Sequence, residues 1–235
     1  MKGYALVLSC EHGGASVPQR YRHLFDSKPA RDALRGHRGS DLGALRLARS
    51  LERRHRVPLY ASTVTRLLVD LNRSLGHPQL FSEFTRDLDP AERESLLDRH
   101  YFPHRTAVES WIDARVRGGD QVLHLGVHSF VPQIDGRART ADIGLLYDPS
   151  RSPERRFCDR WKSSLHEIAP ELRVRRNYPY LGKSDGFTTH LRRALGSPQY
   201  LGIELEVNQR ALRTDENQRF LARVISDSLR AVLRP

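Results

Sequence analysis

The sequence predicts an α/β fold in which a mixed, mostly parallel sheet is flanked by helices on both faces. Short apolar runs rich in β-branched residues alternate along the chain with longer stretches whose apolar residues recur at helical spacing. Several of the short runs are apolar throughout, as expected for strands covered by helices on both faces. No internal repeat, low-complexity tract or linker interrupts the 235 residues. We therefore expect residues 1–235 to form a single domain.

Seven short apolar runs are predicted to be strands. In chain order they comprise residues 4–9, 58–62, 66–70, 121–127, 142–147, 172–176 and 200–207. Four longer stretches are predicted to be helices, namely residues 41–55, 90–117, 153–168 and 215–233. Apolar residues in the last of these form one stripe, which is typical of a helix that packs on a core. The longest irregular stretches, residues 13–40 and 177–189, are expected to be loops that carry function.

The amino-acid composition argues against a nucleic-acid-binding, membrane or secreted protein. The net charge is +11, but the basic residues are spread along the chain and no aromatic-rich RNA-binding signature accompanies them. No run of eighteen apolar residues occurs, and the apolar stretch near the N-terminus is too short for a signal peptide. Cys10 and Cys158 are far apart and form no disulfide or zinc-finger pattern. We expect a cytoplasmic protein without nucleic-acid or membrane partners.

Two histidines lie near the ends of predicted strands. Ligands of open α/β sheets bind where strands end at the carboxyl edge. The first strand runs into Glu11 and His12, followed by two glycines that allow close backbone approach. The fourth strand contains His124 and runs into His128. Because His124 lies inside the strand, it is expected to be a satisfied core histidine, whereas His128 is the better candidate for a ligand.

The last predicted strand carries two carboxylates in an apolar run. Glu204 and Glu206 lie two residues apart, and therefore on the same face of the strand. Burying carboxylates in a central strand is costly unless they meet a cation or take part in chemistry. The alternative is an edge strand with one solvated face.

Two further segments carry polar groups of interest. Arg66, Asn72 and Arg73 flank an apolar run, and arginine presents a planar fork that suits a carboxylate. Asp41 stands at the start of the predicted helix 41–55, where it either caps the helix or ligates a metal. Histidines, carboxylates and an Arg/Asn pair together indicate a metallohydrolase. Zinc with three protein ligands keeps one position open for water, and a glutamate can accept the proton of that water.

Six motifs resemble one enzyme family in order and spacing. They are CEHGGASVP (10–18), HRGSDLGA (37–44), TRLLVDLNR (65–73), GVHSF (126–130), NYPY (177–180) and IELEVNQ (203–209). This pattern resembles the N-formylglutamate amidohydrolase family. More distantly, DLNR and VHSF are similar to segments of zinc carboxypeptidases, which implies a carboxypeptidase-like (phosphorylase/hydrolase-like) α/β fold.

The resemblance implies a metal site. His12 and His128 would ligate one zinc ion (Zn²⁺) per chain, although the same ligand types suit other divalent metals. The carboxypeptidase pattern His-x-x-Glu is absent, because Ala15 stands at the third position after His12. Asp41 is therefore the expected third ligand, and Glu11 is the alternative.

The resemblance also implies a base and a substrate-binding set. Glu206, rather than Glu204, matches the glutamate of the family and is expected to be the general base. Asn72 and Arg73 would bind a substrate carboxylate, with Arg66 as a further candidate. The remaining expected substrate-binding residues lie on the second long loop and are Asn177, Tyr180 and Asp185.

The predicted activity is hydrolysis of an amide bond next to a carboxylate, in an N-formyl or N-acyl amino acid. The first motif reads Cys-Glu-His, whereas relatives that act in histidine breakdown tend to carry Pro-His there. N-formylglutamate is therefore one candidate among other small-molecule N-acyl amino acids. Two alternatives are a zinc carboxypeptidase-like peptidase acting on small peptides and a non-catalytic basic protein that binds polyanions.

Overall fold

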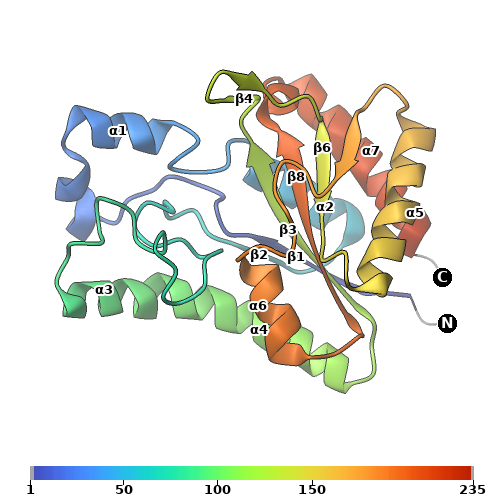
Figure 1. Ribbon diagram of the computed structural model, residues 1–235, viewed down its shortest axis with the longest axis horizontal. Helices are drawn as coiled ribbons and strands as arrows, with labels where there is room; N and C mark the ends of the chain where they lie inside the picture. The colour runs from blue at the N-terminus through green and yellow to red at the C-terminus, as the bar shows by residue number, and fades with distance from the viewer. Residues whose placement is uncertain (1–2, 234–235) are drawn as a thin grey trace.

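The computed structural model describes residues 3–233, and its centre is a six-stranded sheet in the order β2-β1-β3-β8-β6-β7 (Figure 1). β1, β2, β3 and β8 run parallel, β6 pairs antiparallel with β8, and β7 pairs parallel with β6. The prediction of a mixed, mostly parallel sheet is confirmed. The strands are β1 (Ala5–Cys10), β2 (Leu59–Ala61), β3 (Val122–Phe130), β6 (Ile143–Leu146), β7 (Val174–Arg176) and β8 (Tyr200–Asn208).

Helices cover both faces of this sheet (Figure 1). α2 (Ala44–His55), α5 (Ser152–Ile168) and α7 (Asp215–Leu233) pack on one face, and α4 (Phe102–Arg117) and α6 (Phe187–Leu195) pack on the other. β1 shows the consequence, since Leu6 and Leu8 join the first core while Val7 joins the second. Both sets of side chains are buried away from solvent, which stabilises the fold by about 1.5–3 kcal/mol for each large apolar side chain. This is why the strand is apolar throughout.

A separate apolar cluster packs beside the sheet and corrects one prediction. It joins η1 (Gln19–Phe25), α1 (Lys28–Arg35), α3 (Pro90–Leu96) and residues 67–80. The predicted strand at residues 66–70 is wrong, because this segment forms a turn. Leu68 N donates to Thr65 O, and Asp70 N donates to Leu80 O, so the backbone is satisfied without a sheet. A short apolar run indicates a buried segment but does not by itself specify a strand. This run is buried as a turn in the separate cluster.

Other elements agree with the predicted segments or add to them. The helix predicted at 90–117 comprises α3, one π turn η2 (Leu97–Tyr101) and α4. Six short elements lie outside every predicted strand or helix: η1 and α1 within the first long loop, β4 (Gln133–Ile134) and β5 (Arg137–Ala138), which form a hairpin, α6, and η3 (Gln209–Leu212). The second long loop is shorter than predicted, because residues 187–189 already belong to α6.

This second loop lies tightly against the end of β6. A side-chain carbon at Gly144 would lie 1.9 Å from Tyr178 O, and one at Gly182 would lie 2.1 Å from Tyr147 N. Only glycine permits such close backbone approach at these two positions. The packing holds the loop beside β6 and β8.

Candidate active site

Parallel strands bring the candidate residues to one edge of the sheet. β3 and β8 are paired so that His128 is the direct neighbour of Glu206. His12 follows the end of β1, which pairs with the other side of β3. Asp41 N donates to His12 O at 2.9 Å, so the segment before α2 is tied to the end of β1. Four segments distant in sequence therefore meet at the carboxyl edge.

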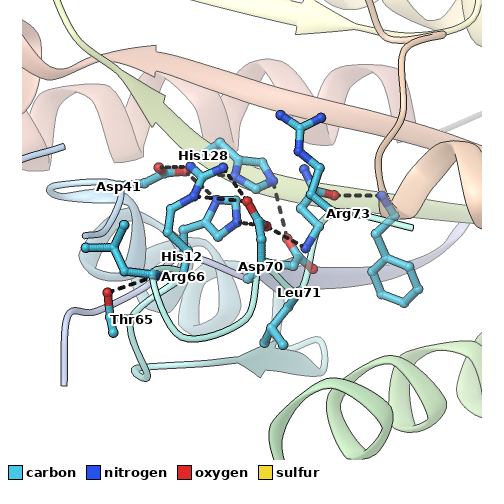
Figure 2. A network of polar contacts seen from close by, with 12 residues as sticks. His12, Asp41, Thr65, Arg66, Asp70, Leu71, Arg73 and His128 are labelled. Atoms are coloured by element: carbon cyan, nitrogen blue, oxygen red, sulfur yellow. Dashed lines mark hydrogen bonds and ion pairs between the residues drawn. The ribbon is translucent and has the colours of Figure 1, made fainter. Parts of the chain in front are cut away.

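His12, Asp41 and His128 form a buried group that could hold a metal ion (Figure 2). Asp41 Oδ2 lies 3.4 Å from His12 Nδ1 and 2.8 Å from His128 Nδ1. Ligand atoms of all three residues lie within 4.8 Å of one another. Tetrahedral zinc, with bonds of about 2.1 Å, places its ligands roughly 3.4 Å apart. The donor types and the spacing both fit such an ion.

A second carboxylate supports His12 from its other side. Asp70 Oδ1 lies 2.7 Å from His12 Nε2, and Arg66 Nη2 donates to Asp70 Oδ2 at 2.7 Å (Figure 2). Asn72 N donates to the same carboxylate at 3.0 Å. Carboxylates that contact the outer nitrogen of a ligating histidine fix its orientation and tautomer. Asp70 occupies that position.

Glu11 is the corresponding carboxylate for His128. Its Oε2 lies 3.2 Å from His128 Nε2, and its Oε1 lies 3.3 Å from His104 Nε2 on α4. Asp41 contacts Nδ1 of the same His128 ring, so Glu11 and Asp41 lie on opposite sides of it. The structure thus groups Asp41, rather than Glu11, with the two histidines.

Ion pairs favour the charged forms of the histidines and carboxyls in this region, although these groups are buried. Burial opposes protonation of His128, but Asp41 and Glu11 raise its pKa well above the usual value. Burial, followed by Arg66, opposes protonation of His12, yet Asp70 and Asp41 leave its pKa raised. Burial disfavours ionisation of Asp41 and Glu11, but their histidine partners hold the pKa of each carboxyl well below its ordinary value. The neighbouring carboxylates therefore favour the protonated form of both rings.

Glu206 differs from these carboxylates because it lacks a strong partner. Its side chain is 6% exposed, and Oε2 has no hydrogen-bond partner among the described residues. Burial raises the pKa of Glu206 to about 8, against the opposing charge of His128. Glu206 lines a cavity of about 330 Å³ together with His12, Asp41 and His128. A carboxyl with a pKa near neutral, placed in a cavity, is suited to proton transfer.

Comparison with known proteins shows to which family the chain belongs. The model of the N-formylglutamate amidohydrolase family matches residues 4–213. The chain belongs to the N-formylglutamate amidohydrolase family. Membership identifies it as an amidohydrolase and implies a small-molecule amide substrate.

Two solved structures resemble this family member over nearly its full length. A gene product from Agrobacterium tumefaciens is 30% identical, with a TM-score of 0.77 over 98% of this chain and 92% of that one. An N-formylglutamate amidohydrolase from Ralstonia eutropha JMP134 is 23% identical, with a TM-score of 0.75 over 99% of this chain and 94% of that one. At 23% identity the second structure demonstrates the shared fold. No curated protein sequence matches the chain.

Most of the predicted substrate-binding residues of this amidohydrolase line the same cavity. Arg66 is engaged by Asp70 and, at 3.5 Å, by Asp41. Tyr180 is 48% exposed, and its hydroxyl accepts a hydrogen bond from Arg139 at 3.1 Å. The predicted residues that line the cavity are Arg66, Asn72, Arg73, Tyr180 and Asp185.

Asn177 is the predicted residue that the cavity lining does not include. Its Oδ1 accepts hydrogen bonds from Tyr147 N at 3.1 Å and from Gly182 N at 3.0 Å. Its φ of 49° places it in the left-handed region, where asparagine is tolerated better than most residues. Asn177 therefore shapes the loop that carries Tyr180 and Asp185.

Two contributors to the site, Asp70 and His104, were given no role by the sequence. Asp70 directly follows the buried run Leu67–Val69. A polar residue at the end of an apolar segment is the sequence feature that could have pointed to it. His104 lies on α4, and nothing in its spacing distinguishes it from other polar residues of that helix. Only tertiary packing brings it to Glu11.

The described residues, 3–233, include no helix that is long and apolar enough to cross a membrane.

Proposed function

We propose that this amidohydrolase is zinc-dependent and cleaves the amide bond of an N-formyl or N-acyl amino acid, with residues 1–235 acting as one catalytic domain. One observation carries the proposal. The buried His12–Asp41–His128 group shares a cavity with Glu206, a carboxyl whose Oε2 has no hydrogen-bond partner among residues 3–233. A three-ligand N/O site beside a free carboxyl is the arrangement of a hydrolytic metal centre.

Charge balance supports a divalent ion, one per chain. His12 Nδ1 and His128 Nδ1 both face Asp41 Oδ2, and the neighbouring carboxylates favour the protonated form of both rings when no metal is bound. Exchange of two protons for one divalent cation leaves the net charge of the site unchanged. Histidine nitrogen and carboxylate oxygen suit zinc, and other divalent ions also accept them. When bound, zinc acts as a Lewis acid and lowers the pKa of a water toward about 7.

Glu206 is proposed as the general base. It stands directly beside His128 across the β3–β8 pair, so it can take the proton of the attacking water. It then gives this proton to the departing amine. With a pKa of about 8 in the metal-free protein, the carboxyl can both lose and regain a proton near neutral pH.

Arg73 is proposed to hold the substrate carboxylate. Within the described part of the chain its guanidinium makes one hydrogen bond, from Nη1 to Asp185 O at 3.3 Å, so most of its five donors remain available. A fixed carboxylate would place the neighbouring amide in a defined geometry. Arg66 can add positive charge on the same side, and Tyr180 can donate its hydroxyl to the developing oxyanion.

The test is hydrolysis of a panel of N-acyl amino acids and small peptides, with and without a chelator. Wild type should cleave N-acyl amino acids and lose activity with the chelator. Glu206→Gln should retain zinc while kcat falls by about 10²–10⁴-fold. Glu167→Gln, an equal change at an exposed position, serves as the control.

The proposed base is refuted if Glu206→Gln matches wild type. Preferential peptide cleavage would identify a peptidase, and salt-sensitive polyanion binding without hydrolysis would identify a binding protein.

A further inference from the structure

The cavity beside the candidate metal group contains charges of both signs, and most are paired within the protein. Asp41 is held by the two histidines, and Arg66 is held by Asp70. Asp185 Oδ2 accepts a hydrogen bond from Ser74 N at 3.1 Å and lies 4.0 Å from His77 Nε2. These groups have their charge compensated before any substrate enters.

Besides Glu206, the proposed base, two charged side chains that line the cavity have no ion-pair partner among the described residues. Arg73 donates only to a backbone carbonyl and forms no ion pair with the described residues. Glu204 has no cationic partner within ion-pair distance in the described part of the chain. Its Oε1 accepts only long hydrogen bonds from neutral groups, Asn72 Nδ2 at 3.4 Å and Thr188 Oγ1 at 3.3 Å. Glu204 is therefore available as a charged acceptor for a ligand in the cavity.

The protein nevertheless fixes the position of Glu204. Asn72 Oδ1 accepts a hydrogen bond from Phe187 N at 2.6 Å, which turns the amide NH₂ of Asn72 toward Glu204. Gly186 approaches so closely that a side-chain carbon there would lie 3.1 Å from Glu204 Oε1. Asn72, which the sequence suggested for the substrate carboxylate, thus also contacts a protein carboxylate.

The two uncompensated groups define the charge pattern of a ligand. Arg73 can accept a carboxylate, and Glu204 offers an acceptor for a positive group within the same cavity of about 330 Å³. Glu204 and Glu206 lie on one face of β8, so a ligand contacting Glu204 also lies beside the proposed base. A second carboxylate on the ligand would meet like charge at Glu204.

We propose that Glu204 is a specificity-determining residue that selects N-acyl derivatives of basic amino acids, whose ammonium or guanidinium it binds while Arg73 binds their carboxylate. This inference rests on the proposed function and names the substrate class. An N-acyl derivative of glutamate, with two carboxylates, fits the cavity less well.

The experiment compares N-formyl derivatives of arginine, lysine, glutamine and glutamate on the zinc-loaded protein. Wild type should show a kcat/KM for the arginine and lysine derivatives at least about tenfold above that for the glutamate derivative. Glu204→Gln should reduce this preference by about tenfold, mainly through KM. Glu167→Gln should keep the wild-type preference, because this exposed position lies outside the cavity.

A binding measurement separates this inference from the proposed function. Dissociation constants of the same four compounds are measured by calorimetry on Glu206→Gln and on Glu204→Gln/Glu206→Gln, so that turnover does not interfere. Tighter binding of the basic derivatives, lost in the double variant, supports the inference even where hydrolysis fails. Equal or tighter binding of the glutamate derivative, or a preference unchanged by Glu204→Gln, overturns it while leaving the hydrolase proposal intact. A thermal unfolding curve for each variant checks that it is folded.

Discussion

β3 carries two buried histidines that differ only in what surrounds them. His124 lies in the middle of the strand, where Nε2 is hydrogen bonded to Ser9 Oγ at 2.8 Å and Nδ1 to Tyr200 OH at 2.9 Å. His128, four residues further on, meets Asp41 and Glu11 instead. Burial lowers the pKa of His124 to about 4, whereas the carboxylates raise the pKa of His128 well above its usual value.

The comparison teaches that burial of a histidine does not by itself indicate a site. Hydroxyl partners satisfy His124 in its neutral form, so it serves the core. Carboxylate partners supply negative charge around His128, which a metal ion can use once the ring gives up its proton. The position at the carboxyl edge of the sheet decides which partners a residue on β3 meets, because loops converge only there.

The largest expected effect separates the two histidines directly. His128→Ala should weaken zinc binding by about 10³-fold or more, because it removes one of three ligands. His124→Gln should retain one zinc per chain. Metal content after dialysis, followed by competition with a coloured chelator, measures both variants. If His128→Ala keeps full zinc affinity, His128 does not belong to the metal site.

A smaller effect is expected from the carboxylates behind the ligands. Asp70→Asn and Glu11→Gln each should lower zinc affinity by about 10–100-fold, because they loosen His12 and His128 respectively. The two changes act on different rings, so the double variant should show approximately the product of the single effects. Chelator competition gives the affinities, and circular dichroism checks that each variant is folded. Unchanged affinity in both single variants would show that the rings are held by other contacts.

The sheet and much of the site were predictable from the sequence because local patterns encode them. The predicted strands at 4–9, 121–127 and 200–207 each end at the observed edge, and residues that follow a parallel strand must gather there. The order of motifs then indicated the family, which the match over residues 4–213 shows. His124 was expected to be a satisfied core histidine, and its hydroxyl partners agree with that prediction.

Features that depend on contacts between distant segments were not predictable. The run at 66–70 resembles a strand, but a second apolar cluster buries it as a turn. His104 reaches Glu11 only because α4 packs against the sheet. The pairing of Asn72 with Glu204 joins segments 132 residues apart, and no local pattern records it.

The smallest expected effect tests the protonation state of His124 through pH. Its pKa is about 4 in the folded protein and about 6.5 when unfolded, so between these values only the unfolded chain binds the proton. Stability contributed by the neutral ring is therefore present above pH 6.5 and lost as pH falls toward 4. At pH 5 the loss of stability from this residue should be about 2 kcal/mol.

Urea unfolding of wild type and His124→Gln at pH 7.5 and pH 5, with chelator in both, measures this loss as the difference between their pH dependences. Because His124→Gln removes two hydrogen bonds at every pH, only that difference reports the proton. An equal fall in both proteins would mean that folding does not shift the pKa of His124, and a smaller fall in wild type would mean that its pKa is raised like that of His128.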